Sequence, residues 1–153
     1  MDICLNINSE KKVDKSLVLE LSRLVEYVLK HLQTDSSCVS VNFVSEGVMR
    51  KMNKQYRGKD KATDVLSFAV CDGKSAEFVG VGDLGDIFLC ASVIKKQAKE
   101  FGVAFEDGLF RVVVHGVLHL IGYDHEKSKK EEKKMFDLQE KILNRYEQKK
   151  NKR

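Results

Sequence analysis

Residues 105–125 read FEDGLFRVVVHGVLHLIGYDH, and this stretch predicts the helix around which the rest of the chain folds. The segment from Phe105 to Ile121 is apolar on nearly all sides, which is typical of a helix surrounded by core. Gly122 follows, and glycine ends helices because it adopts the left-handed conformation at low cost. We therefore expect a buried central helix over residues 105–121, after which the chain turns back.

Three of the four histidines of the chain lie in this stretch. His115 and His119 are four residues apart, so on a helix both imidazoles project from the same face. A turn at Gly122 brings His125 toward them. Three nitrogen ligands without a fourth histidine or cysteine nearby are typical of a catalytic zinc site, in which water or substrate takes the open position. Core histidines bonded to backbone carbonyls are the alternative, and three histidines so close together favour the metal.

Two neighbours of the histidines refine this interpretation. Gly116 stands where zinc peptidases carry the glutamate that acts as general base, so the pattern does not favour peptide hydrolysis. A residue this small also allows another segment to approach the helix closely. Asp124 has two interpretations: it ligates the metal, or it accepts a hydrogen bond from the second ring nitrogen of a histidine.

Strand and helix patterns alternate outside this stretch. Alternating or densely apolar runs predict strands at 2–8, 38–44, 64–70 and 86–90. The apolar density of 64–70 indicates a central strand. Helical spacing predicts further helices that begin after Asp14, after Ser45, at Ala91 and after Ser128.

Two expectations concern the region between these elements. Residues 71–85 are rich in glycine, which predicts a mobile loop or hairpin connection. In the helix that begins at Ala91, the spacing places Ile94, Ala98 and Phe101 on the inner face. Together the elements predict an α+β (mixed α/β) fold. It is expected as a single domain over residues 1–153, with a four-stranded sheet and about five to six helices. The central helix carries the metal ligands, and a basic tail is expected to fray from about residue 147.

Composition narrows the class of protein. No apolar run approaches the roughly 18 residues of a membrane span, and the N-terminus has no signal-peptide pattern. The four cysteines are scattered, with no Cys-x-x-Cys pair, which indicates reduced thiols and a cytoplasmic protein. The net charge is +4, and its positive surplus lies after Glu126. Such a segment is compatible with a polyanionic ligand, although a solvated helix face is the commoner explanation.

Three stretches carry a resemblance to a known family. They are HGVLHLIGYDH at 115–125, MNKQYRGKDKATDVLSF at 52–68 and LGDI at 84–87. The first resembles the signature His-Gly-x-Leu-His-Leu-x-Gly-Tyr-Asp-His of the YbeY family of bacterial rRNA maturation factors. With the order of elements, the resemblance covers residues 2 to about 146. Ala62 stands where the family commonly has proline, which affects the rigidity of a loop and leaves the chemistry intact.

The resemblance implies a single-strand-specific, metal-dependent endoribonuclease that acts in rRNA maturation and ribosome quality control in the cytoplasm. It implies one Zn²⁺ per chain, or another transition metal, on His115, His119 and His125. It also implies catalytic roles for His115, His119 and Arg57, whose guanidinium suits phosphate oxygens. The implied partners are single-stranded RNA, rRNA precursors, and the ribosome or proteins of its small subunit. Neither DNA nor a membrane is expected.

Weaker candidates and rival functions remain at this point. Asp64 and Ser67 are candidates for organising the cleft, and Asp86 for a cap or pair at a strand start. A non-catalytic ribosome assembly factor with a structural metal site is the main alternative function. Hydrolysis of a small amide or nucleotide by the same site is a third.

Overall fold

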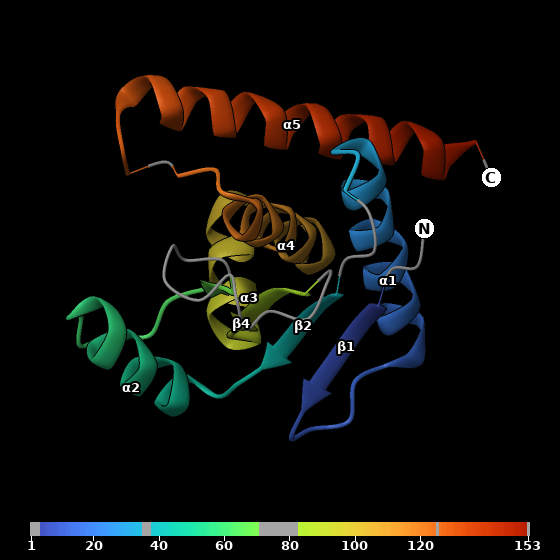
Figure 1. Cartoon of the computed structure of the whole chain (residues 1–153). Helices are drawn as coiled ribbons and strands as arrows, with labels where there is room; N and C mark the ends of the chain where they lie inside the picture. Colours follow the sequence, from blue (N-terminus) through green and yellow to red (C-terminus); the bar gives the residue numbers. More distant parts are fainter. Residues whose placement is uncertain (1–3, 35–37, 71–82, 125, 153) are drawn as a thin grey trace.

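The computed structural model of the chain describes residues 4–34, 38–70, 83–124 and 126–152. Within them the fold is α+β, with strands and helices in the order that the sequence predicts (Figure 1). The elements are β1 (Cys4–Ser9), α1 (Lys15–His31), β2 (Cys38–Phe43), α2 (Glu46–Arg57), β3 (Val65–Ala69), β4 (Asp83–Leu89), α3 (Ala91–Phe101), α4 (Phe105–Ile121) and α5 (Lys129–Asn151).

The strands form one four-stranded sheet in the order β1-β2-β4-β3. β1 pairs with β2 and β2 with β4 in parallel, whereas β3 pairs antiparallel with β4. The expectation of a central strand at 64–70 is therefore wrong, because β3 lies at the edge of the sheet. Its apolar density has another cause: Val65 packs on the main core, and Leu66 is buried with Met49 and Cys90 in a second cluster.

α4 is the buried helix that the sequence predicts. Its residues Leu109, Val113, Val114, Val117 and Leu118 are fully inaccessible to solvent. Figure 1 shows α5 at the top, α4 and α1 beneath it, and the strands below them. α4 is therefore enclosed by the sheet and helices, which explains why it is apolar on most sides.

Side-chain caps fix the starts of three helices, as predicted. Asp14 Oδ1 accepts from the backbone N of Ser16 at 3.0 Å, and Ser45 Oγ from Val48 at 3.2 Å. Ser128 Oγ accepts from the backbone N of Glu131 at 3.1 Å. These hydrogen bonds satisfy backbone groups that have no partner inside the helix.

Two further expectations need correction. β4 begins at Asp83 and not at residue 86, because Asp83 and Gly85 already pair with Cys38 and Val39 of β2. Phe101 is 80% exposed instead of pointing inward, since α3 ends there and Gly102 turns the chain away. Of the loop predicted over 71–85, residues 83–85 belong to β4, and residues 71–82 lie outside the described residues. None of the helices in the described ranges is both long and apolar enough to cross a membrane.

Candidate functional site

A cleft of about 830 Å³ lies beside the C-terminal half of α4, with β3 and the end of α2 along its other walls. His115, His119 and Arg57 all line it, although 57 and 115 are far apart in the sequence. The two weaker candidates Asp64 and Ser67 line it as well. The structure therefore brings together most of the residues that the sequence singled out.

The two helical histidines face each other across one turn of α4. Nε2 of His119 lies 3.1 Å from Nε2 of His115, and the ring centroids are 4.6 Å apart. Two nitrogen lone pairs at this separation repel unless a proton or a cation lies between them. The spacing of four residues thus brings the two imidazoles together on one face of α4, as the sequence predicts.

Gln139 on α5 fixes the orientation of the first histidine. Its Oε1 lies 3.0 Å from Nδ1 of His115, and the glutamine side chain is buried at 5% exposure. If the glutamine oxygen accepts, Nδ1 carries the proton and Nε2 presents its lone pair to the cleft. This is the arrangement of an outer partner that orients a metal-binding imidazole. Gln139 was not among the residues that the sequence patterns singled out. The signal was a polar residue among the buried apolar positions of α5.

The chain beyond α4 turns at Gly122, where φ is 118°. Its backbone N bonds to the carbonyl of His119 at 3.1 Å, which closes the last turn of the helix. Asp124 then accepts a hydrogen bond from the backbone N of Glu126 at 2.9 Å. For His115, the orienting role considered for Asp124 belongs to Gln139. His125 lies outside the described residues.

Arg57 ends α2 at the cleft wall. Its Nη2 forms an ion pair with Oε1 of Glu126, which comes from the segment between α4 and α5. The arginine side chain is 39% exposed and the glutamate 60%, so the pair lies at the mouth of the cleft. A guanidinium in this position can exchange the carboxylate for the oxygens of a phosphate.

The loop after Arg57 is tied to the body of α2 by Asn53. The side-chain Nδ2 of Asn53 donates to the backbone carbonyl of Lys61 at 2.8 Å. The backbone carbonyl of Asn53 accepts from the backbone N of Lys59 at 3.3 Å. The side chain is buried at 2% exposure. Asn53 thus holds the loop that joins Arg57 to the cleft wall at β3.

Gly116 sets the distance between the histidine helix and the sheet. A Cβ atom at this position would lie 3.1 Å from Cδ1 of Ile87 and 3.2 Å from Oγ of Ser67. Both distances are tighter than ordinary contacts, so α4 packs so closely against β3 and β4 that a Cβ atom fits here only if its neighbours shift. This confirms the close approach that the sequence analysis expected. The close packing also places Ser67 beside Gly116, the residue that follows His115 on the helix.

The remaining candidate carboxylates have local roles. Asp64 Oδ1 accepts from the backbone N of Val65 at 2.8 Å and from Oγ1 of Thr63 at 3.2 Å. It therefore shapes the start of β3 while it lines the cleft. Asp86 is an exposed residue within β4, where it pairs with Phe68 of β3, and not at the start of a strand.

The donor set suits a transition metal. Within the described ranges, which leave out residue 125, no three histidine, cysteine, aspartate or glutamate side chains come together as a metal-binding group. The two Nε2 atoms that converge nevertheless have the chemistry of zinc ligands, and Gln139 supplies the second hydrogen bond that such ligands usually make. The residues present therefore fit a zinc-like ion.

Comparisons with known proteins point in one direction. Residues 4–147 match the family described as Endoribonuclease YbeY. The chain is 40% identical over 134 residues to Endoribonuclease YbeY of Persephonella marina, covering 88% of this chain and 84% of the relative. It is 38% identical over 153 residues to that of Bacillus licheniformis, covering 95% and 96%. The solution structure of TM1509 from Thermotoga maritima superposes with a TM-score of 0.64 at 37% identity, covering 91% of this chain and 86% of the other.

Proposed function

The chain belongs to the endoribonuclease YbeY family, and on that premise we propose that it cleaves single-stranded RNA in a zinc-dependent reaction, with rRNA precursors as substrates. RNA cleavage follows from the family. The metal, the preference for single strands and the role in rRNA maturation are the proposal. We also propose the cytoplasm as its location and the ribosome, or proteins of its small subunit, as its partner.

One observation carries the proposal: two converging imidazoles and an arginine share a single cleft. His115, His119 and, from the sequence, His125 would hold the metal. When bound, the metal supplies a Lewis acid that polarises the phosphate and activates water for attack on phosphorus. A single strand suits the cleft because its phosphates are accessible without opening a duplex.

The side chains of the cleft have separate tasks in this scheme. Arg57 leaves Glu126 and binds two oxygens of the phosphate, which stabilises the negative charge that grows there. Gln139 keeps the proton of His115 on Nδ1, so that Nε2 stays available as a ligand. Lys127, at the edge of the cleft, faces the backbone of the RNA.

The test compares two histidine variants on a purified single-stranded rRNA fragment. His119→Ala is expected to abolish cleavage and to lower the amount of zinc that copurifies with the protein. His31→Ala is the matched control, since His31 lies at the end of α1 and does not line the cleft. Full metal-dependent cleavage by His119→Ala would rule out the proposed site.

The non-catalytic alternative predicts a different result. A folded, metal-free His119→Ala protein would then restore ribosome maturation in cells that lack the native protein. The relatives that carry the name endoribonuclease favour the catalytic role. Failure of the variant to restore maturation is therefore the expected outcome.

A further inference from the structure

The positive charges of α5 are unevenly distributed around the helix. At about 100° per residue, Lys130, Lys134, Lys141, Arg145 and Lys149 fall within an arc of about 100°. We call these five residues the basic flank. Glu131 is the carboxylate at the edge of this arc, and Asp137 lies just outside it. The opposite flank is balanced, because it combines Lys129, Lys133 and Lys150 with Glu132, Glu140 and Glu147.

The basic flank begins at the cleft. The Nζ atom of Lys134 lies 6.0 Å from the centre of the Tyr123 ring, and Tyr123 lines the cleft. Lys127, two residues before α5, lines the cleft as well. Lysine side chains therefore extend from the cleft wall onto the helix.

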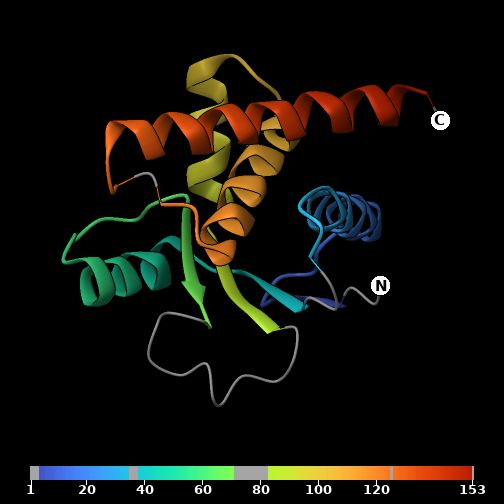
Figure 2. The same ribbon diagram turned by 45° about the horizontal axis from the view of Figure 1, so that its top comes forward.

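The basic flank continues to the end of α1. Burial lowers the pKa of His31, and the charges of Arg145 and Lys141 lower it further, which places both side chains near this histidine. The Nζ atom of Lys149 on α5 lies 5.4 Å from the centre of the Tyr27 ring, which, like His31, belongs to α1. Figure 2 shows α5 crossing above α4 and extending over α1.

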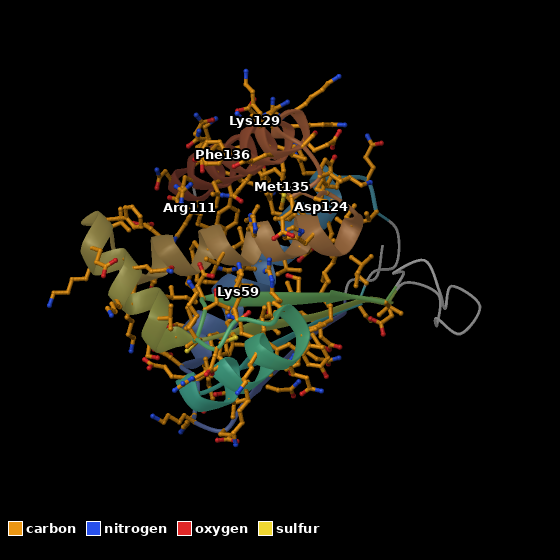
Figure 3. The ribbon with its side chains drawn as sticks, turned by 90° about the vertical axis from the view of Figure 1, so that its left-hand side faces the viewer. Lys59, Arg111, Asp124, Lys129, Met135 and Phe136 are labelled. Carbon is orange, nitrogen blue, oxygen red and sulfur yellow. The ribbon has the colours of Figure 1, made fainter. Side chains whose placement is uncertain are left out.

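The flank is accessible to a ligand. Its five side chains are all exposed, and none of them forms an ion pair within the part of the chain that the structure describes. On the opposite flank, Glu140 pairs with Arg111 of α4. In Figure 3, Phe136 of α5 and Arg111 of α4 lie on the side of α3, whereas Asp124 lies on the other side.

The chemistry of the flank favours a polyanion. A helix that binds a membrane surface needs an exposed apolar face beside its lysines. Here the apolar face of α5 is turned inward, since Met135, Ile142 and Tyr146 are at most 1% exposed. Spaced cations along a helix match the repeated phosphates of an extended strand.

We propose that the basic flank binds the backbone of a single-stranded RNA segment that leaves the cleft and runs along α5 toward the end of α1. From Lys130 to Arg145 the track is about 22 Å long, at 1.5 Å per residue. The inference rests on the proposed function, because it extends the path of the same substrate. Contacts to phosphates carry no sequence information, so the track increases affinity for long RNA without selecting its sequence.

The test uses two double variants that remove equal charge from α5. Lys141→Gln/Arg145→Gln alters the basic flank, and Lys129→Gln/Lys133→Gln is the control on the opposite side. Binding of a long, labelled polyuridine is followed by fluorescence anisotropy over a series of salt concentrations, in the presence of a chelator so that no cleavage occurs. A short oligouridine that fills only the cleft is the reference ligand.

The basic-flank variant is expected to bind the long RNA more weakly. The slope of log K against log salt should fall by about 0.7 for each lost contact, hence by about 1.4 for the pair. Its affinity for the short RNA should follow that of the native protein, and the control should keep the native slope. Equal losses in both double variants would overturn the track, because net charge alone would then explain binding. Loss of binding to phosphatidylserine vesicles with unchanged RNA affinity would overturn it too.

Cleavage of the short RNA, measured separately with zinc, reports on the proposed function. A native protein that binds long RNA through the flank but cuts neither RNA would contradict the function and keep the track. If the native protein cuts the short RNA but the basic-flank variant keeps the native slope of log K against log salt, the track is contradicted and the proposed function is not.

Discussion

Gln139 on α5 holds His115 on α4 through a 3.0 Å contact between its Oε1 atom and the Nδ1 atom of the imidazole. The two residues are 24 positions apart, and the glutamine is buried. The site is thus supported by two helices and not by the histidine helix alone. A change in α5 should therefore alter the metal affinity proposed for the site without touching a proposed ligand.

Gln139→Leu is the direct check of this support. It removes the glutamine acceptor from the partly buried Nδ1–H of His115, which costs about 1–3 kcal/mol of unfolding free energy. Loss of an outer partner of this kind weakens metal affinity by about 10–100-fold. Urea denaturation and a zinc competition titration measure the two effects. Gln148→Leu, at an exposed position of the same helix, should change neither. Native zinc affinity in Gln139→Leu would show that the contact does not support the site.

Two glycines of α4 provide a matched pair for the packing of the site. Gly116→Ala forces a Cβ to within 3.1 Å of Ile87 and 3.2 Å of Ser67, which should cost about 1–3 kcal/mol of overpacking. Gly108→Ala meets its nearest atoms at 3.5 and 3.6 Å, which are ordinary contacts. It should gain up to about 1 kcal/mol from helix propensity. In thermal unfolding, Gly116→Ala should have a lower Tm than the native protein and Gly108→Ala a higher one. Equal stability would mean that α4 can shift away from the sheet without cost.

Glu126→Gln tests the ion pair at the mouth of the cleft. The native carboxylate competes with phosphate for Arg57 and repels RNA, so its removal should lower the KM for single-stranded RNA. Exposed ion pairs are worth about 0.2–1 kcal/mol, which corresponds to a change of up to about fivefold. Glu132→Gln removes the same charge on the opposite flank of α5 and should leave KM close to the native value. A higher KM in Glu126→Gln would indicate that the glutamate positions Arg57 for substrate.

His31 should titrate below 6.5, its ordinary pKa, because burial and the nearby charges of Arg145 and Lys141 disfavour its protonated form. The unfolded chain binds a proton here more readily than the folded one. The contribution of His31 to stability is therefore present above pH 6.5 and is lost as the pH falls through the lowered pKa.

Histidine NMR signals followed across pH measure this pKa directly. Lys141→Gln should raise it, whereas Lys133→Gln, on the opposite flank of α5, should not. The difference in stability between native protein and His31→Gln should decrease or reverse below pH 6.5. A pKa of His31 above 6.5 would contradict the arrangement of charges along α5.

The order of elements and the convergence of His115 with His119 could be predicted because their signals are local. Spacing of four residues places two imidazoles on one helix face, and Ser45 and Ser128 cap the helices that they precede. The position of β3 could not be predicted in this way. Apolar density reports that a strand is covered on both faces, and β3 is covered by two clusters although it lies at the sheet edge.

Gln139 shows the second limit. Its role depends on a partner in another helix, and a single polar residue within an apolar stripe has several explanations. Phe101 illustrates the converse, since helical spacing placed it on the inner face of α3 although the helix ends there. Residues at the end of a helix lose the neighbours on which such a pattern relies.

The support of His115 by Gln139 has a consequence for the time at which the site becomes complete. A ribosome makes the chain from its N-terminus, so the histidine is synthesised 24 residues before the glutamine that orients it. While α5 is still inside the exit tunnel, α4 has neither this hydrogen bond nor the cover of Met135 and Ile142. A nascent chain surrounded by ribosomal RNA therefore lacks the Gln139 contact that orients His115 until α5 has emerged.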